Sequence, residues 1–191
     1  RRSSQRKLIQ NQQQRLRSPQ CSLDKPLDNH LDMQYRQVYC HGTAPTAINS
    51  HSVTIEAEDL NLSNYQLESN NAASGNQLIT LLNSGSTQGI ASAQFTGASG
   101  TYDVEITYFD ENDGQGQLLV DIAGNQSNLS LDQNLGSGGV SSNNRVTTKI
   151  FSAVQINNGE TLLIAGTANA GEWARVDKIE FIPVARSEEH T

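Results

Sequence analysis

The chain alternates between short β-forming runs and turn-forming residues, and this spacing limits the possible folds more than any other feature. Between residues 53 and 182, runs rich in Val, Ile, Thr, Tyr and Phe recur about every 8–15 residues, separated by Gly, Asn, Asp and Ser. No window of about 11 residues has a helical period. The predicted strands are Val53–Ala57, Tyr65–Glu68, Leu78–Leu82, Ile90–Phe95, Thr101–Phe109, Gln117–Ala123, Asn128–Leu131, Arg145–Phe151, Thr161–Gly166 and Ala174–Ile182.

One run shows the period of a half-buried strand most clearly. In TYDVEITYF, the apolar residues Tyr102, Val104, Ile106 and Tyr108 alternate with polar ones. Alternation with a period of two indicates one buried and one solvated face. The segments TGASG, DENDGQG and LGSGGVSSNN between runs are typical turn material. The pattern predicts an all-β jelly-roll sandwich of two antiparallel sheets.

Charge divides the chain into three parts. Residues 1–50 hold 8 Lys or Arg and 3 Asp or Glu, whereas residues 51–185 hold 4 Lys or Arg and 15 Asp or Glu. We expect residues 1–50 to be a basic, Gln-rich tail or linker, disordered or irregular, or the end of another domain. Residues 51–185 are the predicted sandwich. Residues 186–191, RSEEHT, are expected to be a non-native tail.

The acidic balance restricts the partners of the predicted domain. Nucleic acid binding requires clustered Lys and Arg, which an acidic domain lacks. No run of 18 apolar residues is present, so no membrane insertion is expected. The composition suits a secreted, extracellular or cell-surface protein. Cys21 and Cys40 both lie in the tail, where either a disulfide or two free thiols fits the sequence.

The sequence contains no catalytic motif. G-x-S-x-G, H-E-x-x-H and C-x-x-C are all absent, and the histidines are His30, His41, His51 and His190, in the tails or at the domain edge. A hydrolase triad inside the sandwich would therefore lack its base. A pair of carboxylates, as in glycosidases, is not excluded by residue type. We expect no enzymatic activity.

Two acidic patterns suit a hard cation. Glu56 and Glu58 are two residues apart in a predicted strand, so both carboxylates point from one face. Asp177 lies in a run with Ile179 and Phe181 on the predicted inward face, where a carboxylate needs a partner, either a cation or Arg175. Calcium takes six to eight oxygen ligands, several of them from carboxylates. The alternative for the two glutamates is a solvated strand face.

Four segments together resemble a known family. The opening TIEAEDL, then SGNQLI and SGTYDVEITYF, and the closing RVDKIEF occur in the order and spacing of family 6 and family 35 carbohydrate-binding modules. The resemblance covers residues 54–183, which is nearly the whole predicted domain. It implies a non-catalytic jelly-roll module that binds polysaccharide or oligosaccharide and is joined to a catalytic or adhesive domain.

The resemblance also implies a structural calcium ion. Members commonly hold this ion through the paired acids of the first strand and the Asp of the last. In this sequence those positions are Glu56, Glu58 and Asp177.

The ligand positions depart from the family pattern. Two aromatic rings usually clamp the sugar, and they would fall near residues 80–81 and 139–144, where no aromatic residue is present. Arg175 also stands where the family favours Asn, two residues before the final Asp. The usual sugar cleft is therefore not expected here.

A different binding site is predicted just before the last strand. Trp173 is the only Trp, and with Asn169, Glu172 and Arg175 it would give a stacking face with polar groups. The guanidinium fork of Arg175 suits a uronate or sulfate group. The alternatives are a partly buried anchoring role for Trp173, and for Arg175 a salt bridge to Asp177 or to the acidic loop.

That acidic loop is DENDG, residues 110–114. The simplest interpretation is a hairpin turn with Gly114 at positive φ. Alternatively, Asn112 or Asp113 contacts a second ion or a sugar hydroxyl. The sequence thus predicts a polysaccharide-binding module with structural calcium; the alternative is a structural or adhesive sandwich that binds no sugar.

Overall fold

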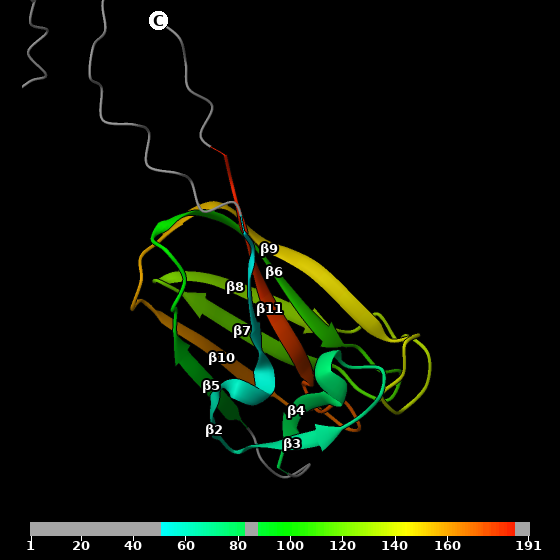
Figure 1. Ribbon diagram of the computed structural model, residues 1–191. Coiled ribbons are helices and arrows are strands. Elements are labelled where there is room, and N and C mark those ends of the chain that lie inside the picture. The colour runs from blue at the N-terminus through cyan, green and yellow to red at the C-terminus, as the bar shows by residue number, and fades with distance from the viewer. Residues whose placement is uncertain (1–50, 83–87, 186–191) are drawn as a thin grey trace, which may run out of the picture. The chain divides into compact units, whose positions relative to one another are not determined.

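The computed structural model describes residues 51–82 and 88–185 as a two-layer β-sandwich (Figure 1). The predictions for residues 1–50 and 186–191 lie outside the described residues. No helix within the described ranges is long and apolar enough to span a membrane. The strands are β1 (Val53–Glu56), β2 (Asn61–Ser63), β3 (Tyr65–Ser69), β4 (Gln77–Leu81), β5 (Gly89–Gln94), β6 (Gly100–Phe109), β7 (Gly116–Ile122), β8 (Asn125–Leu131), β9 (Arg145–Ile156), β10 (Thr161–Thr167) and β11 (Val176–Pro183), with 3-10 turns η1 (Ala57–Asp59) and η2 (Ser74–Asn76).

Both sheets are antiparallel throughout. One has six strands in the order β3-β4-β11-β6-β9, with β1 paired to β11, and the other has five in the order β2-β5-β10-β7-β8. The connections β4–β5, β5–β6, β6–β7, β9–β10 and β10–β11 each cross from one sheet to the other. The predicted jelly-roll sandwich is therefore confirmed.

The core lies between the inward faces of the two sheets. Val104, Ile106, Leu118, Val120 and Ile164 are fully buried there. Three rings, Phe95, Tyr102 and Phe181, form edge-on and tilted contacts, with centroids 4.7–6.2 Å apart. Such aromatic pairs add about 0.5–1.5 kcal/mol each beyond the burial of their area. This packing makes the sandwich a rigid support for its loops.

All ten predicted strands are present. Each predicted run contains or overlaps one strand of the structure, and β9 continues to Ile156, beyond its predicted end. The structure adds β2, a three-residue edge strand paired with β5. Its sequence, Asn-Leu-Ser, is too short and too polar to show a period.

Strand β11 holds the six-stranded sheet together. It pairs with β6 along one edge, while β1 and β4 share the other edge end to end. The register shifts between Val176 and Lys178, so Asp177 is the extra residue of a β-bulge. A bulge interrupts the alternation of side chains, and this changes where Asp177 points.

The acidic loop does not form the expected hairpin. Residues 110–115 connect β6 in one sheet with β7 in the other, so they form a crossover between the layers. Gly114 does not have a positive φ. It is a glycine because of crowding: a Cβ there would lie 2.0 Å from the backbone oxygen of Asn169. Close packing of two loops, rather than turn geometry, requires the glycine.

This packing gives the first prediction. Gly114→Ala is expected to lower the free energy of unfolding by about 1–3 kcal/mol, because the backbone of Asn169 must move. The matched control is Gly139→Ala, where a Cβ would meet no atom within 4 Å, and it should change stability by less than about 0.5 kcal/mol. Urea unfolding followed by fluorescence measures both. Equal stability of the two variants would contradict the close approach.

Candidate functional site

Two groups of acidic side chains meet at the segment that leads into β11. One group contains Asp177 and the other surrounds Arg175, two residues earlier. The segment is fixed from both sides, because the Tyr65 hydroxyl donates to the Ala174 carbonyl at 3.1 Å and Leu81 N–H donates to the Trp173 carbonyl at 3.4 Å. The positions of both groups therefore depend on the same few backbone contacts.

The first group, here named the β1 acid cluster, consists of Glu56, Glu58 and Asp177. All three converge on the η2 turn: the Ser74 hydroxyl donates to Glu56 Oε1 at 3.0 Å, and Ser74 N–H donates to Asp177 Oδ1 at 2.8 Å. A Cβ on Gly75, which has φ of +59°, would lie 3.1 Å from Glu58 Oε1. The structure thus brings together the three acids singled out in the sequence.

The backbone features that bring these acids together differ from the strand alternation expected from the sequence. Glu58 belongs to the 3-10 turn η1 rather than to a strand, so the turn brings its carboxylate toward that of Glu56. Asp177 is fully buried, but the bulge directs it to Ser74 and Arg145 instead of the inward face. Its cationic neighbour is Arg145, whose Nη2 lies 3.0 Å from Asp177 Oδ2. Arg145 was not singled out in the sequence because 32 residues separate it from Asp177.

The negative charge of the β1 acid cluster is only partly compensated by Arg145 and by hydrogen-bond donors. Glu56 Oε2 and Glu58 Oε2 are buried without a hydrogen-bond partner. Burial raises the pKa of Glu58, and the charges of Glu56 and Asp177 raise it further. Burial also raises the pKa of Asp177, against the lowering effect of Ser74 N–H and Arg145. Within residues 51–82 and 88–185, however, no group of three His, Cys, Asp or Glu side chains is arranged to hold a metal ion.

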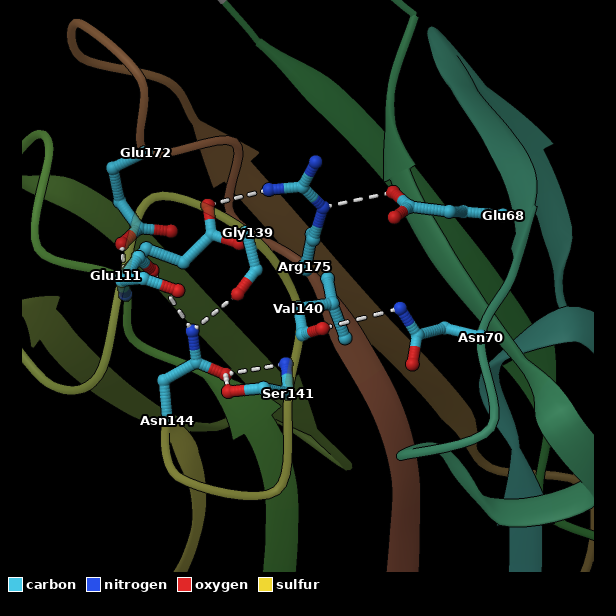
Figure 2. Close-up of polar contacts among 10 residues, drawn as sticks. Glu68, Asn70, Glu111, Gly139, Val140, Ser141, Asn144, Glu172 and Arg175 are labelled. Carbon is cyan, nitrogen blue, oxygen red and sulfur yellow. Dashed lines mark hydrogen bonds and ion pairs between the residues drawn. The ribbon is translucent and has the colours of Figure 1, made fainter.

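The second group, named the loop acid cluster, consists of Glu68, Asp110, Glu111, Asp113 and Glu172 and lies around Arg175. Figure 2 labels Glu68, Glu111 and Glu172 beside Arg175. Arg175 Nε donates to Glu68 Oε2 at 2.8 Å and Nη1 donates to Glu111 Oε2 at 2.5 Å. Its guanidinium carbon also lies 5.9 Å from the centre of the Trp173 ring, at cation–π distance. The side chain is only 15% exposed. Of the alternatives for Arg175, a salt bridge to the acidic loop is the one observed.

Two glutamates of the loop acid cluster are almost completely buried. Glu111 is 1% and Glu172 is 0% exposed, and Glu111 N–H donates to Glu172 Oε2 at 2.6 Å. Burial raises the pKa of each carboxyl to about 7, although Arg175 lowers both. The remaining oxygens, Glu111 Oε1 and Glu172 Oε1, have no partner. Glu172 was predicted as a ligand contact, and the structure places it beneath the surface.

The other predicted ligand residues lie at the surface above this buried pair. Asn112, Asp113 and Asn169 are exposed, and Trp173 is half-buried against the core. Asn112 Nδ2 donates to the Gly136 carbonyl at 3.1 Å, and Gly171 N–H donates to the Asp113 carbonyl at 3.0 Å. Loops 110–115 and 168–175 therefore present these groups as one packed surface.

Glycine lets the loops pack around Asp113. A Cβ on Gly171 would lie 2.1 Å from Asp113 Oδ2, and one on Gly138 would lie 2.5 Å from the same atom. The carboxylate therefore rests directly on two backbone segments. Neither glycine has a positive φ, so the contact with Asp113 favours glycine at both positions. It does not require glycine there, because the exposed Asp113 side chain can turn away.

A third loop, residues 132–144, is fixed by the buried side chain of Asn144 (Figure 2). Asn144 Nδ2 donates to the Gly139 carbonyl at 2.8 Å, and its Oδ1 accepts from Ser141 N–H at 2.9 Å. Asp110 N–H donates to the Asn144 carbonyl at 2.9 Å, which joins this loop to the acidic loop. Rigid loops at one end of a sandwich are where such folds place recognition.

Sequence reasoning named the acidic loop as a possible partner of Arg175 without singling out Glu111, and it missed Glu68. Glu111 belongs to the acidic loop that was noticed, but only the exposed Asn112 and Asp113 were proposed as contacts. Glu68 carries no signal, because it is 107 residues from Arg175 in the chain. Their ion pairs with Arg175 arise only from the fold.

The buried acids give a pH prediction. Glu111 and Glu172 bind protons more tightly in the folded protein than in the unfolded chain. They therefore stabilise the fold at low pH, and this contribution is lost as the pH rises from about 4.5 to about 7. Glu172→Gln keeps an acceptor for Glu111 N–H without the charge. It should raise stability at pH 8 by about 1–3 kcal/mol and flatten the pH profile.

The pH profile is measured by thermal melts from pH 4 to pH 9. Glu105→Gln is the matched control, because Glu105 lies between the buried Val104 and Ile106 on the outer face of β6. A Glu172→Gln profile parallel to that of Glu105→Gln would contradict the raised pKa values.

The chain can now be compared with known proteins. No family model matches it. A probable α-glucuronidase A from Aspergillus niger is 32% identical over 150 residues, covering 71% of this chain and 17% of the fungal protein. The chain therefore spans less than a fifth of the length of the curated relatives it matches.

Solved structures share the sandwich. A β-(1,4)-mannanase of Podospora anserina, described as GH26-CBM35, superposes with a TM-score of 0.56 at 18% identity, over 74% of this chain and 30% of that protein. A family 35 carbohydrate-binding module from Clostridium thermocellum superposes with a TM-score of 0.52 at 20% identity, over 70% of this chain and 99% of that module. Residues 51–185 therefore share the β-sandwich fold of these two structures.

Proposed function

We propose that residues 51–185 are a non-catalytic module that binds polysaccharide on behalf of a glycan-active enzyme. The proposal is carried by how much of each known protein the domain matches. The domain matches a free-standing carbohydrate-binding module over 99% of that module, and aligns with only 17% of an α-glucuronidase. A segment of that size accounts for a complete accessory domain of a larger enzyme.

We also propose that the module acts outside the cell or at its surface, because the extracellular polysaccharides that such modules bind are too large to enter cells intact. The acidic domain is compatible with such an environment. The alternative, a structural or adhesive sandwich, predicts the same location but no glycan affinity.

We place the glycan site at the surface of loops 110–115 and 168–175. Trp173 offers a partly exposed ring against which the apolar face of a sugar can pack. Asn112, Asp113 and Asn169 are exposed on the same two loops and offer polar groups that can pair with hydroxyls. Burial excludes Glu172 from contact with a ligand, so its role is to support the loop through Glu111 N–H.

Trp173→Ala tests this location. Loss of the ring should weaken glycan binding by about 1 kcal/mol or more, which is about fivefold or more in dissociation constant. Trp173→Phe keeps a ring and should retain most of the affinity. A glycan array on residues 51–185 identifies the ligand, calorimetry measures it, and thermal melts check the folding of both variants. Unchanged binding by a folded Trp173→Ala variant would place the site elsewhere.

The same array separates the two functions. Binding to any polysaccharide supports the module, whereas a folded domain that binds none supports the adhesive alternative. The domain is also expected to hydrolyse no glycoside. Turnover that survives purification and is lost in an Asp113→Asn variant would contradict the non-catalytic proposal.

We further propose that the β1 acid cluster holds a structural calcium ion. Support comes from the buried, unpaired Glu56 Oε2 and Glu58 Oε2, which a hard cation would satisfy. Asp177 adds a third carboxylate, already close to Arg145. The three carboxylates are not arranged as a metal site in this structure, so their side chains would have to turn toward the ion. Three side chains do not complete a calcium shell, so backbone oxygens and water would have to contribute. The ion would neutralise buried charge and join β1, η2 and β11.

Calcium titration tests this proposal. Calcium at about 100 times its dissociation constant should stabilise the fold by about 2.7 kcal/mol, and a chelator should remove the gain. Glu58→Gln should abolish the response, whereas Glu105→Gln should retain it. Melting temperatures with and without calcium give the result. A melting temperature that ignores both calcium and chelator would show that the cluster is not a metal site.

A further inference from the structure

The charge of the loop acid cluster bears on which glycans the proposed site accepts. Two features suggest an acidic sugar: a Trp beside an Arg, and a relative named as an α-glucuronidase. Binding of a uronate or sulfate requires a cationic group with free donors, such as an open guanidinium fork. Whether the guanidinium of Arg175 has free donors therefore decides whether the site can bind an acidic sugar.

Arg175 is already occupied by the protein. Glu68 takes its Nε and Glu111 takes its Nη1, while its guanidinium group lies at cation–π distance from Trp173. With 15% of its side chain exposed, the guanidinium presents little surface to a ligand. Its charge compensates the buried Glu111 and the partly exposed Glu68, and displacing Glu111 would leave a buried anion without its partner.

The other cations of the domain are also paired. Within residues 51–82 and 88–185 the remaining Lys and Arg side chains each form an ion pair, joining Arg145 to Asp177, Lys149 to Asp103 and Lys178 to Glu180. This part of the chain therefore has no cationic side chain without a carboxylate neighbour.

Carboxylates, in contrast, outnumber cationic side chains around Arg175. Around the single guanidinium, the charges of Asp113 and Glu68 raise the pKa of Glu111. The charges of Glu111 and Asp110 likewise raise the pKa of Glu172. Glu111 Oε1 and Glu172 Oε1 are buried beneath the surface without a donor. An exposed carboxylate such as Asp113 accepts hydrogen bonds from sugar hydroxyls. Brought within about 4 Å of a ligand carboxylate, it would oppose binding by about 1 kcal/mol even in water, or about fivefold.

We infer that the site discriminates by charge: its ligand is a neutral, hydroxyl-rich polysaccharide, and uronic-acid and sulfated glycans are rejected. The inference rests on the proposed glycan-binding function and narrows its ligand class. The relative named as a glucuronidase would then share the module's fold without the module binding the acidic sugar itself. Glu68, Glu111 and Asp113 are the residues that set this selectivity.

The test compares polymers that differ in charge. Polygalacturonan, its carboxyl-reduced form, glucuronoxylan, unsubstituted xylan, mannan and β-1,3-glucan are offered to residues 51–185 at low salt, with chelator and then with calcium. We expect binding to at least one neutral polymer and to neither acidic one. Preferred binding to an acidic polymer, with or without calcium, would overturn the inference while leaving the glycan-binding proposal intact. Binding to none would overturn both.

Two isosteric variants sharpen the result. Glu68→Gln releases one edge of Arg175 and Asp113→Asn removes the exposed charge. Each should improve binding of the acidic polymers relative to the neutral ligand by about fivefold at low salt, and the gain should shrink as salt is added. Glu105→Gln makes the same charge change on the outer face of β6 and should alter neither ratio. An equal effect of all three variants would mean that net charge, not this cluster, governs the preference.

Discussion

The compensation of buried carboxylates around the start of β11 is the constraint on which this domain depends. Glu111, Glu172 and Asp177 are each almost completely removed from water, and an unpaired buried charge costs several kcal/mol. The structure offsets part of this cost with two arginines and a few backbone N–H groups. Burial also raises the pKa of all three carboxyls, which favours their neutral forms. The compensation is partial, because Glu111 Oε1 and Glu172 Oε1 have no hydrogen-bond partner.

The same arrangement bears on the resemblance found in the sequence. The fold agrees with that of a family 35 module. Two residues before Asp177, where the resemblance predicts Asn, this chain has Arg175, and two glutamates far away in sequence pair with it. Arg175 is therefore part of a local network and not an isolated difference.

The fold was largely predictable from the sequence because a period of two and turn residues act locally. All ten predicted strands are present, and only the short, polar β2 gave no signal. The site was less predictable. A β-bulge redirected Asp177, a 3-10 turn placed Glu58, and a crossover replaced the expected hairpin at Gly114. The partners of Arg175 and Asp177 depend on contacts between distant segments, which no local pattern records.

The sharing of one edge of β11 by β1 and β4 also determines how the module can be attached to a larger protein. Val53 pairs with Phe181, so the polypeptide enters and leaves the sandwich through adjacent strands (Figure 1). Strand β11 has 8 residues, a length of about 25 Å, and Trp173 precedes its opposite end. Val53 and Pro183, at the outer ends of these two strands, thus lie at the pole away from the proposed binding surface. A larger protein joined at either end would therefore leave the proposed binding surface free.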